Sequence, residues 1–250
     1  WTTGPKIVER AGYKRDRSGY VDTGWTHLFM VPAEGGTARQ LTSGDWNHNG
    51  VSWSPDGEEI YFTSYRTEDW AAPEHWQESD IYAVEIATGS IRRLTDDRGA
   101  DTSPVPSPDG SLIAYISGDE HDDTYRNSRI HLMNRDGSEK RSISRNYDRQ
   151  SSGLMWAPNG RGLYFSVSRE GYRSLHSVSI DGGVKQITDG TRLVTLSSFS
   201  DDGTAVGTIT SAHEPGDLYR WNLTNPDQAV QLTRVNDDIL HNVTLGEVEE

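Results

Sequence analysis

Trp53-Ser54-Pro55-Asp56-Gly57 is the stretch that decides the fold, because variants of it return three more times along the chain. The later copies are Pro106-Ser107-Pro108-Asp109-Gly110, Trp156-Ala157-Pro158-Asn159-Gly160 and Phe199-Ser200-Asp201-Asp202-Gly203, at intervals of 53, 50 and 43 residues. Proline presets φ at the second position of a β-turn, Asp or Asn suits the third, and glycine accepts positive φ before the next strand. Each copy therefore predicts a tight turn between two strands.

A second marker lies at the end of each repeat and stays in phase with the turn. It pairs an aliphatic residue with a Thr or Ser, and its copies are Gln40-Leu41-Thr42, Arg93-Leu94-Thr95, Arg141-Ser142-Ile143-Ser144, Gln186-Ile187-Thr188 and Gln231-Leu232-Thr233. Between the markers, short runs such as Glu59–Thr63 and Asp80–Ile86 are typical of β-strands, and each repeat holds about four of them. Two markers in phase indicate a true internal repeat.

Repeats of this length and strand content predict an all-β fold, a β-propeller of four-stranded antiparallel blades, because a solenoid repeat is shorter. Complete blades are expected at about 51–95, 104–144, 154–188 and 197–233, after part of a fifth at 1–42. We expect a single domain over 1–250, truncated from a ring of about seven or eight blades. In an alternative arrangement, residues 1–25 supply inner strands and a five-bladed ring closes.

An aromatic residue precedes three of the four turns, namely Trp53, Trp156 and Phe199. On an inner strand, each would be buried against the neighbouring blade. Burial of such a side chain contributes roughly 2–3 kcal/mol. These three residues are therefore predicted to pack between blades, and no catalytic role is assigned to them.

Composition excludes several classes of function. The chain has 38 acidic and 24 basic residues, a net charge of −14 and no cysteine. The negative charge opposes binding to nucleic acid, and no apolar run approaches the roughly 20 residues that cross a membrane. Absence of cysteine excludes disulfides and thiolate metal sites. The oligomeric state and the compartment stay open, with a soluble cytoplasmic location favoured over a periplasmic or secreted one.

The N-terminal part of the chain carries a resemblance to a known family. The residues that carry it, in addition to the repeated turns, are Lys6–Arg10, Tyr13–Asp16, Gly19–Asp22, His27–Phe29, Gln40–Thr42 and Gly44-Asp45. Together they resemble the propeller of acylaminoacyl peptidases and related dipeptidyl aminopeptidases, in the prolyl oligopeptidase group of serine peptidases. The Trp-Ser-Pro-Asp-Gly turn itself is shared with TolB-like propellers.

The resemblance implies that the whole protein is a serine peptidase acting on short peptides, with an α/β-hydrolase domain as the partner of this propeller. Residues 234–250 would begin another blade or lead into that domain. The chain itself contains no Gly-x-Ser-x-Gly elbow, so we assign it no catalytic residue. Its histidines show no metal-binding spacing, so neither metal nor cofactor is expected.

Two other functions use the same repeats. A stand-alone TolB-like propeller would act as a protein-binding module of the cell envelope, and it would carry a secretory signal. A propeller lyase acting on acidic sugars would need a cluster of inward histidines with a metal ion, and the eight histidines here are scattered along the sequence.

The longest insertions all fall on one face of the predicted propeller, at 64–79, at 118–128 and at 16–24. Long loops on one side of a rigid scaffold indicate a binding face. The first insertion supplies the candidate residues that face substrate or the hydrolase domain: Arg66, Glu68, Trp70, Glu74, His75 and Trp76. Aromatic rings beside carboxylates suit the ammonium group of a peptide N-terminus. In the alternative interpretation they only cover the edge of the blade.

Overall fold

The structure is a computed structural model of the 250-residue chain. It describes residues 4–5, 7–8, 13–17, 19–20, 24–66, 78–118, 127–188 and 192–246. The chain comprises two compact units. One is formed by Trp1–Pro104 with Gly118–Thr124, and the other by Val105–Ser117 with Tyr125–Glu250.

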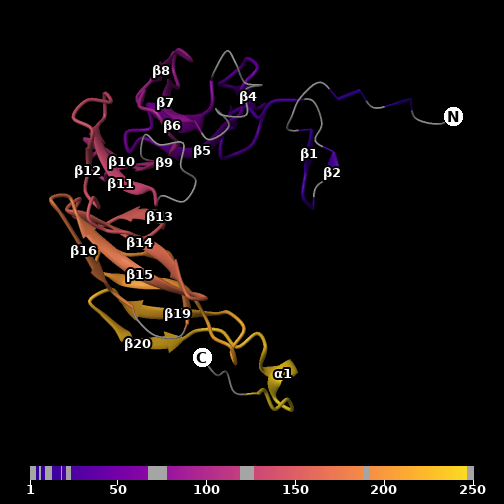
Figure 1. Cartoon of the computed structure of the whole chain (residues 1–250), viewed down its shortest axis with the longest axis vertical. Coiled ribbons are helices and arrows are strands. Elements are labelled where there is room, and N and C mark those ends of the chain that lie inside the picture. Colours follow the sequence, from indigo (N-terminus) through magenta and orange to yellow (C-terminus); the bar gives the residue numbers. More distant parts are fainter. Residues whose placement is uncertain are drawn as a thin grey trace. The chain divides into compact units, whose positions relative to one another are not determined.

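The described residues form short strands and one helix of four residues (Figure 1). In chain order the elements are β1 (Lys14–Arg15), β2 (Gly19–Tyr20), β3 (Phe29–Met30), β4 (Arg39–Gln40), β5 (His48–Trp53), β6 (Glu59–Ser64), β7 (Asp80–Glu85), β8 (Ile91–Arg93), β9 (Asp101–Pro106), β10 (Leu112–Ser117), β11 (Arg129–Asn134), β12 (Arg141–Ser142), β13 (Ser151–Trp156), β14 (Gly162–Arg169), β15 (Tyr172–Ser179), β16 (Gly182–Gln186), β17 (Leu193–Phe199), β18 (Thr204–Thr210), β19 (Asp217–Asn222), β20 (Asn225–Gln231) and α1 (Asp237–Leu240). Within the described ranges, no helix has the length and apolar character needed to cross a membrane.

Four groups of four strands follow one another along the chain: β5–β8, β9–β12, β13–β16 and β17–β20. Neighbouring strands within a group pair in chain order, and the registers of β5–β8 and β13–β16 are antiparallel throughout. The hairpin of β3 and β4 precedes the first group as part of an earlier blade. This confirms the predicted all-β fold of four-stranded blades. The size of the whole ring and the single domain remain predictions.

The repeated turn is stabilised by its serine. Ser107 Oγ donates a hydrogen bond to Asp109 Oδ1 over 2.6 Å and accepts one from the backbone N–H of Leu112 over 2.9 Å. Gly110 ends the turn with a φ of +72°, a conformation that favours glycine. The serine-to-aspartate bond recurs at the same length, 2.6 Å, between Ser54 and Asp56 and between Ser200 and Asp202. The turn therefore recurs in sequence because one hydrogen-bonded geometry recurs in space.

The second marker closes the outer hairpin of each blade. In every copy its hydroxyl oxygen accepts a hydrogen bond from a backbone N–H across the hairpin, over 2.8–3.0 Å: Thr42 from Leu28, Thr95 from Ile81, Ser144 from Ile130, Thr188 from Leu175 and Thr233 from Leu218. Aliphatic residues of the marker, such as Leu94 and Ile143, are buried in the core. In these copies the marker closes the hairpin and also buries an aliphatic side chain, whereas Leu232 of the last copy is 52% exposed.

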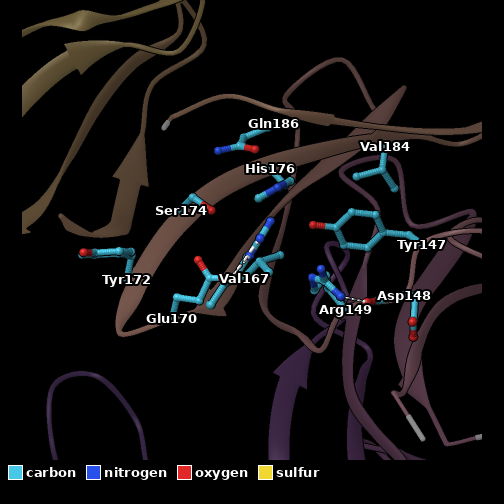
Figure 2. A pocket seen from close by; sticks show the side chains of 11 residues that line it. Tyr147, Asp148, Arg149, Val167, Glu170, Tyr172, Ser174, His176, Val184 and Gln186 are labelled. Atoms are coloured by element: carbon cyan, nitrogen blue, oxygen red, sulfur yellow. Dashed lines mark hydrogen bonds and ion pairs between the residues drawn. The ribbon is translucent and has the colours of Figure 1, made fainter. Parts of the chain in front are cut away.

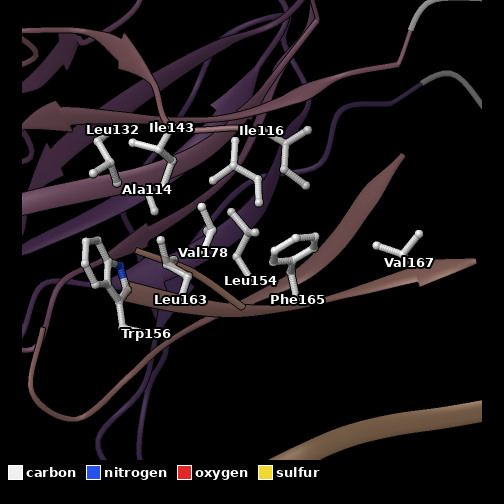
Figure 3. Packing of buried hydrophobic residues seen from close by; sticks show 11 residues of the cluster. Ala114, Ile116, Leu132, Ile143, Leu154, Trp156, Leu163, Phe165, Val167 and Val178 are labelled. Carbon is white, nitrogen blue, oxygen red and sulfur yellow. The ribbon is translucent and has the colours of Figure 1, made fainter. Parts of the chain in front are cut away.

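Trp156 packs between two blades of its unit, as predicted. It is 7% exposed and belongs to the largest hydrophobic cluster, to which β10, β11, β13, β14 and β15 contribute (Figure 3). Its indole Nε1–H donates a hydrogen bond to the carbonyl of Val105 over 2.9 Å. Phe199 is partly buried and meets Tyr164 edge to face, with ring centroids 5.4 Å apart.

The prediction of a buried Trp53 is wrong for the described structure, in which Trp53 is 50% exposed. The described part of the preceding blade is the hairpin β3–β4. Its Leu28 and Leu41 cover Ile60 and Phe62 on β6, and Trp53 on β5 lies outside that cluster. An inner-strand aromatic is buried only where inner strands of the neighbouring blade lie against it.

Three consecutive blades carry a pair of aromatic rings at the same position. In each blade, the residue five positions after the turn glycine pairs across the sheet with a ring on the third strand. The pairs are Phe62 with Tyr82, Tyr115 with His131, and Phe165 with His176, and their ring centroids lie 5.7, 5.4 and 5.6 Å apart. This repeated pair forms part of the buried layer beneath the insertion-bearing end of each blade.

Candidate functional site

Arg66 is the one predicted site residue that the structure describes. It follows directly after β6, where the insertion 64–79 begins. Glu68, Trp70, Glu74, His75 and Trp76 lie outside the described residues.

His48 and Tyr82 hold the guanidinium of Arg66 from two sides. Arg66 Nη2 lies 3.0 Å from His48 Nε2, and the guanidinium carbon lies 4.4 Å from the centroid of the Tyr82 ring. His48 Nδ1 lies 2.9 Å from the carbonyl oxygen of Thr26. Because a carbonyl oxygen only accepts, Nδ1 carries the proton and Nε2 accepts from Arg66. The head of Arg66 is therefore oriented by a hydrogen bond and by a cation–π contact.

Electrostatics keep His48 neutral. Burial lowers the pKa of His48 below its ordinary value, and the positive charge of Arg66 lowers it further, while the hydrogen bond to the Thr26 carbonyl opposes both effects. Burial also lowers the pKa of Arg66. An arginine nevertheless stays protonated at neutral pH. The cluster is thus one cation supported by a neutral imidazole and an aromatic ring.

The charge of Arg66 is not neutralised within the part of the chain that the structure describes, since no ion pair there joins it to a carboxylate. Its other close polar partner is the hydroxyl of Ser64, at 3.4 Å from Nε. The remaining N–H groups can donate to an acceptor brought by a ligand or by another domain. Carboxylates suit this role because guanidinium binds them in a fork geometry.

A cavity lies at the corresponding end of the blade β13–β16, in the second unit (Figure 2). Its volume is about 660 Å³. The lining residues come from the loop that leads into β13, from the β14–β15 hairpin and from β16: Tyr147, Asp148, Arg149, Val167, Arg169, Glu170, Tyr172, Ser174, His176, Val184 and Gln186. Both the entering loop and the hairpin turn belong to the face that the sequence predicts for binding.

Arg66, the described member of the predicted site residues, does not line this cavity, although the repeat contained a signal for it. Arg66 and Arg169 each lie nine residues after the glycine of their own turn, so they are equivalent in the two blades. His176 likewise occupies the position of Tyr82, because each pairs with the phenylalanine of the aromatic pair. If the blades are aligned on their turn glycines, Arg66 of one blade coincides with Arg169 of another, which lines this cavity.

No cluster of three or more His, Asp or Glu side chains that could hold a metal ion occurs among the residues with described positions. In each unit, arginine, histidine and tyrosine side chains lie close together and supply hydrogen-bond donors and aromatic faces.

Comparison with known proteins shows to which family the chain belongs. Residues 19–188 match the family model described as the TolB beta propeller domain. The chain belongs to the TolB β-propeller family. Dipeptidyl-peptidase 5 of Porphyromonas gingivalis is 30% identical over 197 residues, which cover 77% of this chain and 28% of that protein. A Tol-Pal system protein TolB of Francisella tularensis is 30% identical over 135 residues, which cover 54% of this chain and 28% of that protein.

Among solved structures, acylaminoacyl peptidase from Pyrococcus horikoshii superposes with a TM-score of 0.69 at 19% identity. The match covers 95% of this TolB-family chain and 35% of the peptidase. The chain therefore spans between a quarter and about a third of the length of these relatives. The expected resemblance, to peptidase propellers and to TolB, is confirmed, and the structural match supports the fold alone.

Proposed function

We propose that this chain is the propeller domain of a serine peptidase of the prolyl oligopeptidase group. In this role it restricts entry to short peptides and positions them for an α/β-hydrolase domain of the whole protein. The observation that carries the proposal is the 30% identity to a dipeptidyl-peptidase over 77% of this chain.

The reaction would be acyl transfer, with the nucleophile, its histidine, its acid and the oxyanion hole all supplied by the hydrolase domain. This chain contributes binding. Arg66 is a preoriented cation at the base of the insertion 64–79, and the same insertion carries Glu74 and Trp76. A carboxylate of the substrate or of the hydrolase domain would bind Arg66. The ammonium group of a peptide would bind Glu74 beside the Trp76 ring.

Kinetics of the full-length protein test this assignment. We expect Arg66→Ala to lower kcat/KM about 10- to 100-fold, because a charge-assisted hydrogen bond contributes about 1.5–3 kcal/mol. Glu74→Ala and Trp76→Ala are each expected to lower kcat/KM for peptides with a free amine more than for N-acylated peptides. Arg161→Ala is the control, because Arg161 lies before β14, at the other end of that strand from Arg169. Unchanged kcat/KM for both substrate types in all three variants would contradict the substrate role.

A stand-alone TolB-like binding module is the second candidate, favoured by the family match and by the similarity to TolB of Francisella tularensis. A fluorophosphonate probe separates the two, since it labels an activated serine covalently. Labelling of the full-length protein, together with cleavage of short peptides, would support the peptidase. A full-length protein that is neither labelled nor active would be a binding module.

A further inference from the structure

We propose that the cavity at the loop end of the blade β13–β16 binds a small ligand through a carboxylate group. The site lies within one unit of the chain and is lined by side chains from three separate segments (Figure 2). Its volume of about 660 Å³ falls within the range of small-molecule sites, about 300–1,000 Å³.

Arg149 supplies the charge for this binding. Its Nη1 donates to the backbone carbonyl of Asp148 over 2.8 Å, and no ion pair with a carboxylate engages it in the described part of the chain. The two acidic residues of the lining have partners of their own. Glu170 pairs with Arg169 at 2.9 Å, and Asp148 accepts a hydrogen bond from Asn127 over 2.8 Å. The two carboxylates balance the formal charges of Arg149 and Arg169, and of the two guanidinium groups Arg149 is the one without an ion pair among the described residues.

Tyr147 lies near both guanidinium groups of the lining. Burial raises the pKa of its hydroxyl, and the charges of Arg149 and Arg169 lower it, while no carboxylate is among the causes. In Figure 2 the Tyr147 hydroxyl points from its loop toward the region of His176. A carboxylate near this hydroxyl would meet the guanidinium of Arg149, the guanidinium of Arg169 that already pairs with Glu170, and a hydrogen-bond donor.

His176 gives an independent indication of a ligand. Its side chain lines the cavity and is 5% exposed, and no described group meets Nδ1 with the geometry of a hydrogen bond, although the nearby backbone of Ser174 raises the pKa of the imidazole. A buried polar nitrogen without a partner is unfavourable by about 1–3 kcal/mol. The rings of Phe165 and Tyr147, each with its centroid 5.6 Å away, hold the imidazole in place. A ligand in the cavity can therefore supply a hydrogen-bond partner for this nitrogen.

The remaining lining residues determine which groups the ligand can carry next to its carboxylate. Val167 and Val184 supply an apolar surface, while Ser174 and Gln186 supply neutral polar groups. Such a site suits a short body with an amide or alkyl group next to the carboxylate. Two sources share this chemistry, the C-terminal residue of a short peptide and a free organic acid. The inference goes beyond the proposed peptidase function and does not depend on it.

Calorimetric titration of the full-length protein tests the site with three probes: N-acetylglycine, N-acetylglycinamide and propionate. The two glycine derivatives differ only in the carboxylate, so N-acetylglycine is expected to bind at least 10-fold more tightly than the amide. Propionate separates the sources. Tighter binding of N-acetylglycine than of propionate indicates a peptide C-terminus, and equal binding indicates small organic acids in general.

Variants locate the binding. Arg149→Ala is expected to weaken N-acetylglycine at least 10-fold, whereas Arg161→Ala, which removes the same charge at the other end of β14, is expected to change it less than 2-fold. His176→Phe keeps a ring against Phe165 and is expected to weaken the acid and leave the amide unchanged. Equal affinity for acid and amide, no binding of any probe, or equal effects of Arg149→Ala and Arg161→Ala would overturn the proposal. Because Arg149 is exposed, its variant remains informative if His176→Phe fails to fold.

Discussion

Replacement of Trp156 by alanine tests the packing between two blades. An aromatic side chain of this kind buries on the order of 200 Å², and Trp156 is only 7% exposed. At about 25 cal/mol per Å², this burial corresponds to ~5 kcal/mol, of which alanine retains a small part. Trp156→Ala is therefore expected to lower the free energy of unfolding by ~3–5 kcal/mol, the usual range for such a change.

A second variant separates the hydrogen bond from the packing. Trp156→Phe keeps most of the buried ring and leaves the Val105 carbonyl without its 2.9 Å donor. We expect it to be less stable than wild type by about 1–3 kcal/mol. Trp53 provides the matched control, since it occupies the equivalent position before its own turn and is 50% exposed. Trp53→Ala is expected to lower the unfolding free energy by ~1–2 kcal/mol, because half of the ring is already in water.

Urea unfolding of the 250-residue chain, followed by far-UV circular dichroism, measures these differences. Circular dichroism is preferred to fluorescence because each variant removes a tryptophan fluorophore. A loss for Trp156→Ala no greater than that for Trp53→Ala would refute the reasoning. It would mean that the cluster around β13 and β14 does not gain stability from the area that Trp156 buries.

Three further predictions concern single contacts. Ser107→Ala should lower the free energy of unfolding by about 1–3 kcal/mol, because it leaves the Leu112 N–H without its acceptor. Ala157→Ser, which restores the serine in the third turn, should raise the free energy of unfolding by ~1 kcal/mol. Urea titrations in which both variants change stability in the same direction would contradict this. Gly207→Ala should lower the free energy of unfolding by about 1–3 kcal/mol or more, because a Cβ would lie 2.0 Å from the Thr195 carbonyl oxygen. A Cβ at Gly246 would meet no atom within 4 Å, so Gly246→Ala should leave the stability unchanged in the same assay. Burial lowers the pKa of His176, so the unfolded chain binds more protons, and stability should be retained above about pH 6.5 and fall as the pH drops below it. The melting temperature should therefore fall less between pH 7.5 and pH 5.5 in His176→Phe than in wild type. An equal fall in both proteins would count against this assignment.

The turns and hairpin closures were predictable from sequence because each depends on residues close together in the chain. Ser107, Asp109 and Gly110 act within one turn, so their spacing alone indicates the structure. The burial of the inner aromatics was harder, because it depends on the neighbouring blade. Trp156 and Trp53 precede similar turns and differ in what lies against them.

The cavity was not predictable from any one segment, because three short segments form it, and only the equivalence of Arg169 to Arg66 after their turn glycines points to it. Arg149 lies in a polar loop, and His176 is a single histidine within a strand. Only the pairing of β14 with β15 places His176 against Phe165. Arg66 was predicted as a site residue from the loop it begins, but its support by His48 comes from the start of another strand. The role of Arg66 in binding stays a prediction.

The aromatic pair shared by three blades has a consequence for how such a protein changes over evolutionary time. The third-strand position holds tyrosine in one blade, Tyr82, and histidine in two others, His131 and His176, while the ring spacing stays within 5.4–5.7 Å. One substitution there exchanges a phenol, whose pKa burial raises in Tyr82, for an imidazole, whose pKa burial lowers in His176, with little change in ring spacing. A duplicated blade can thus acquire sensitivity to acid independently of its neighbours.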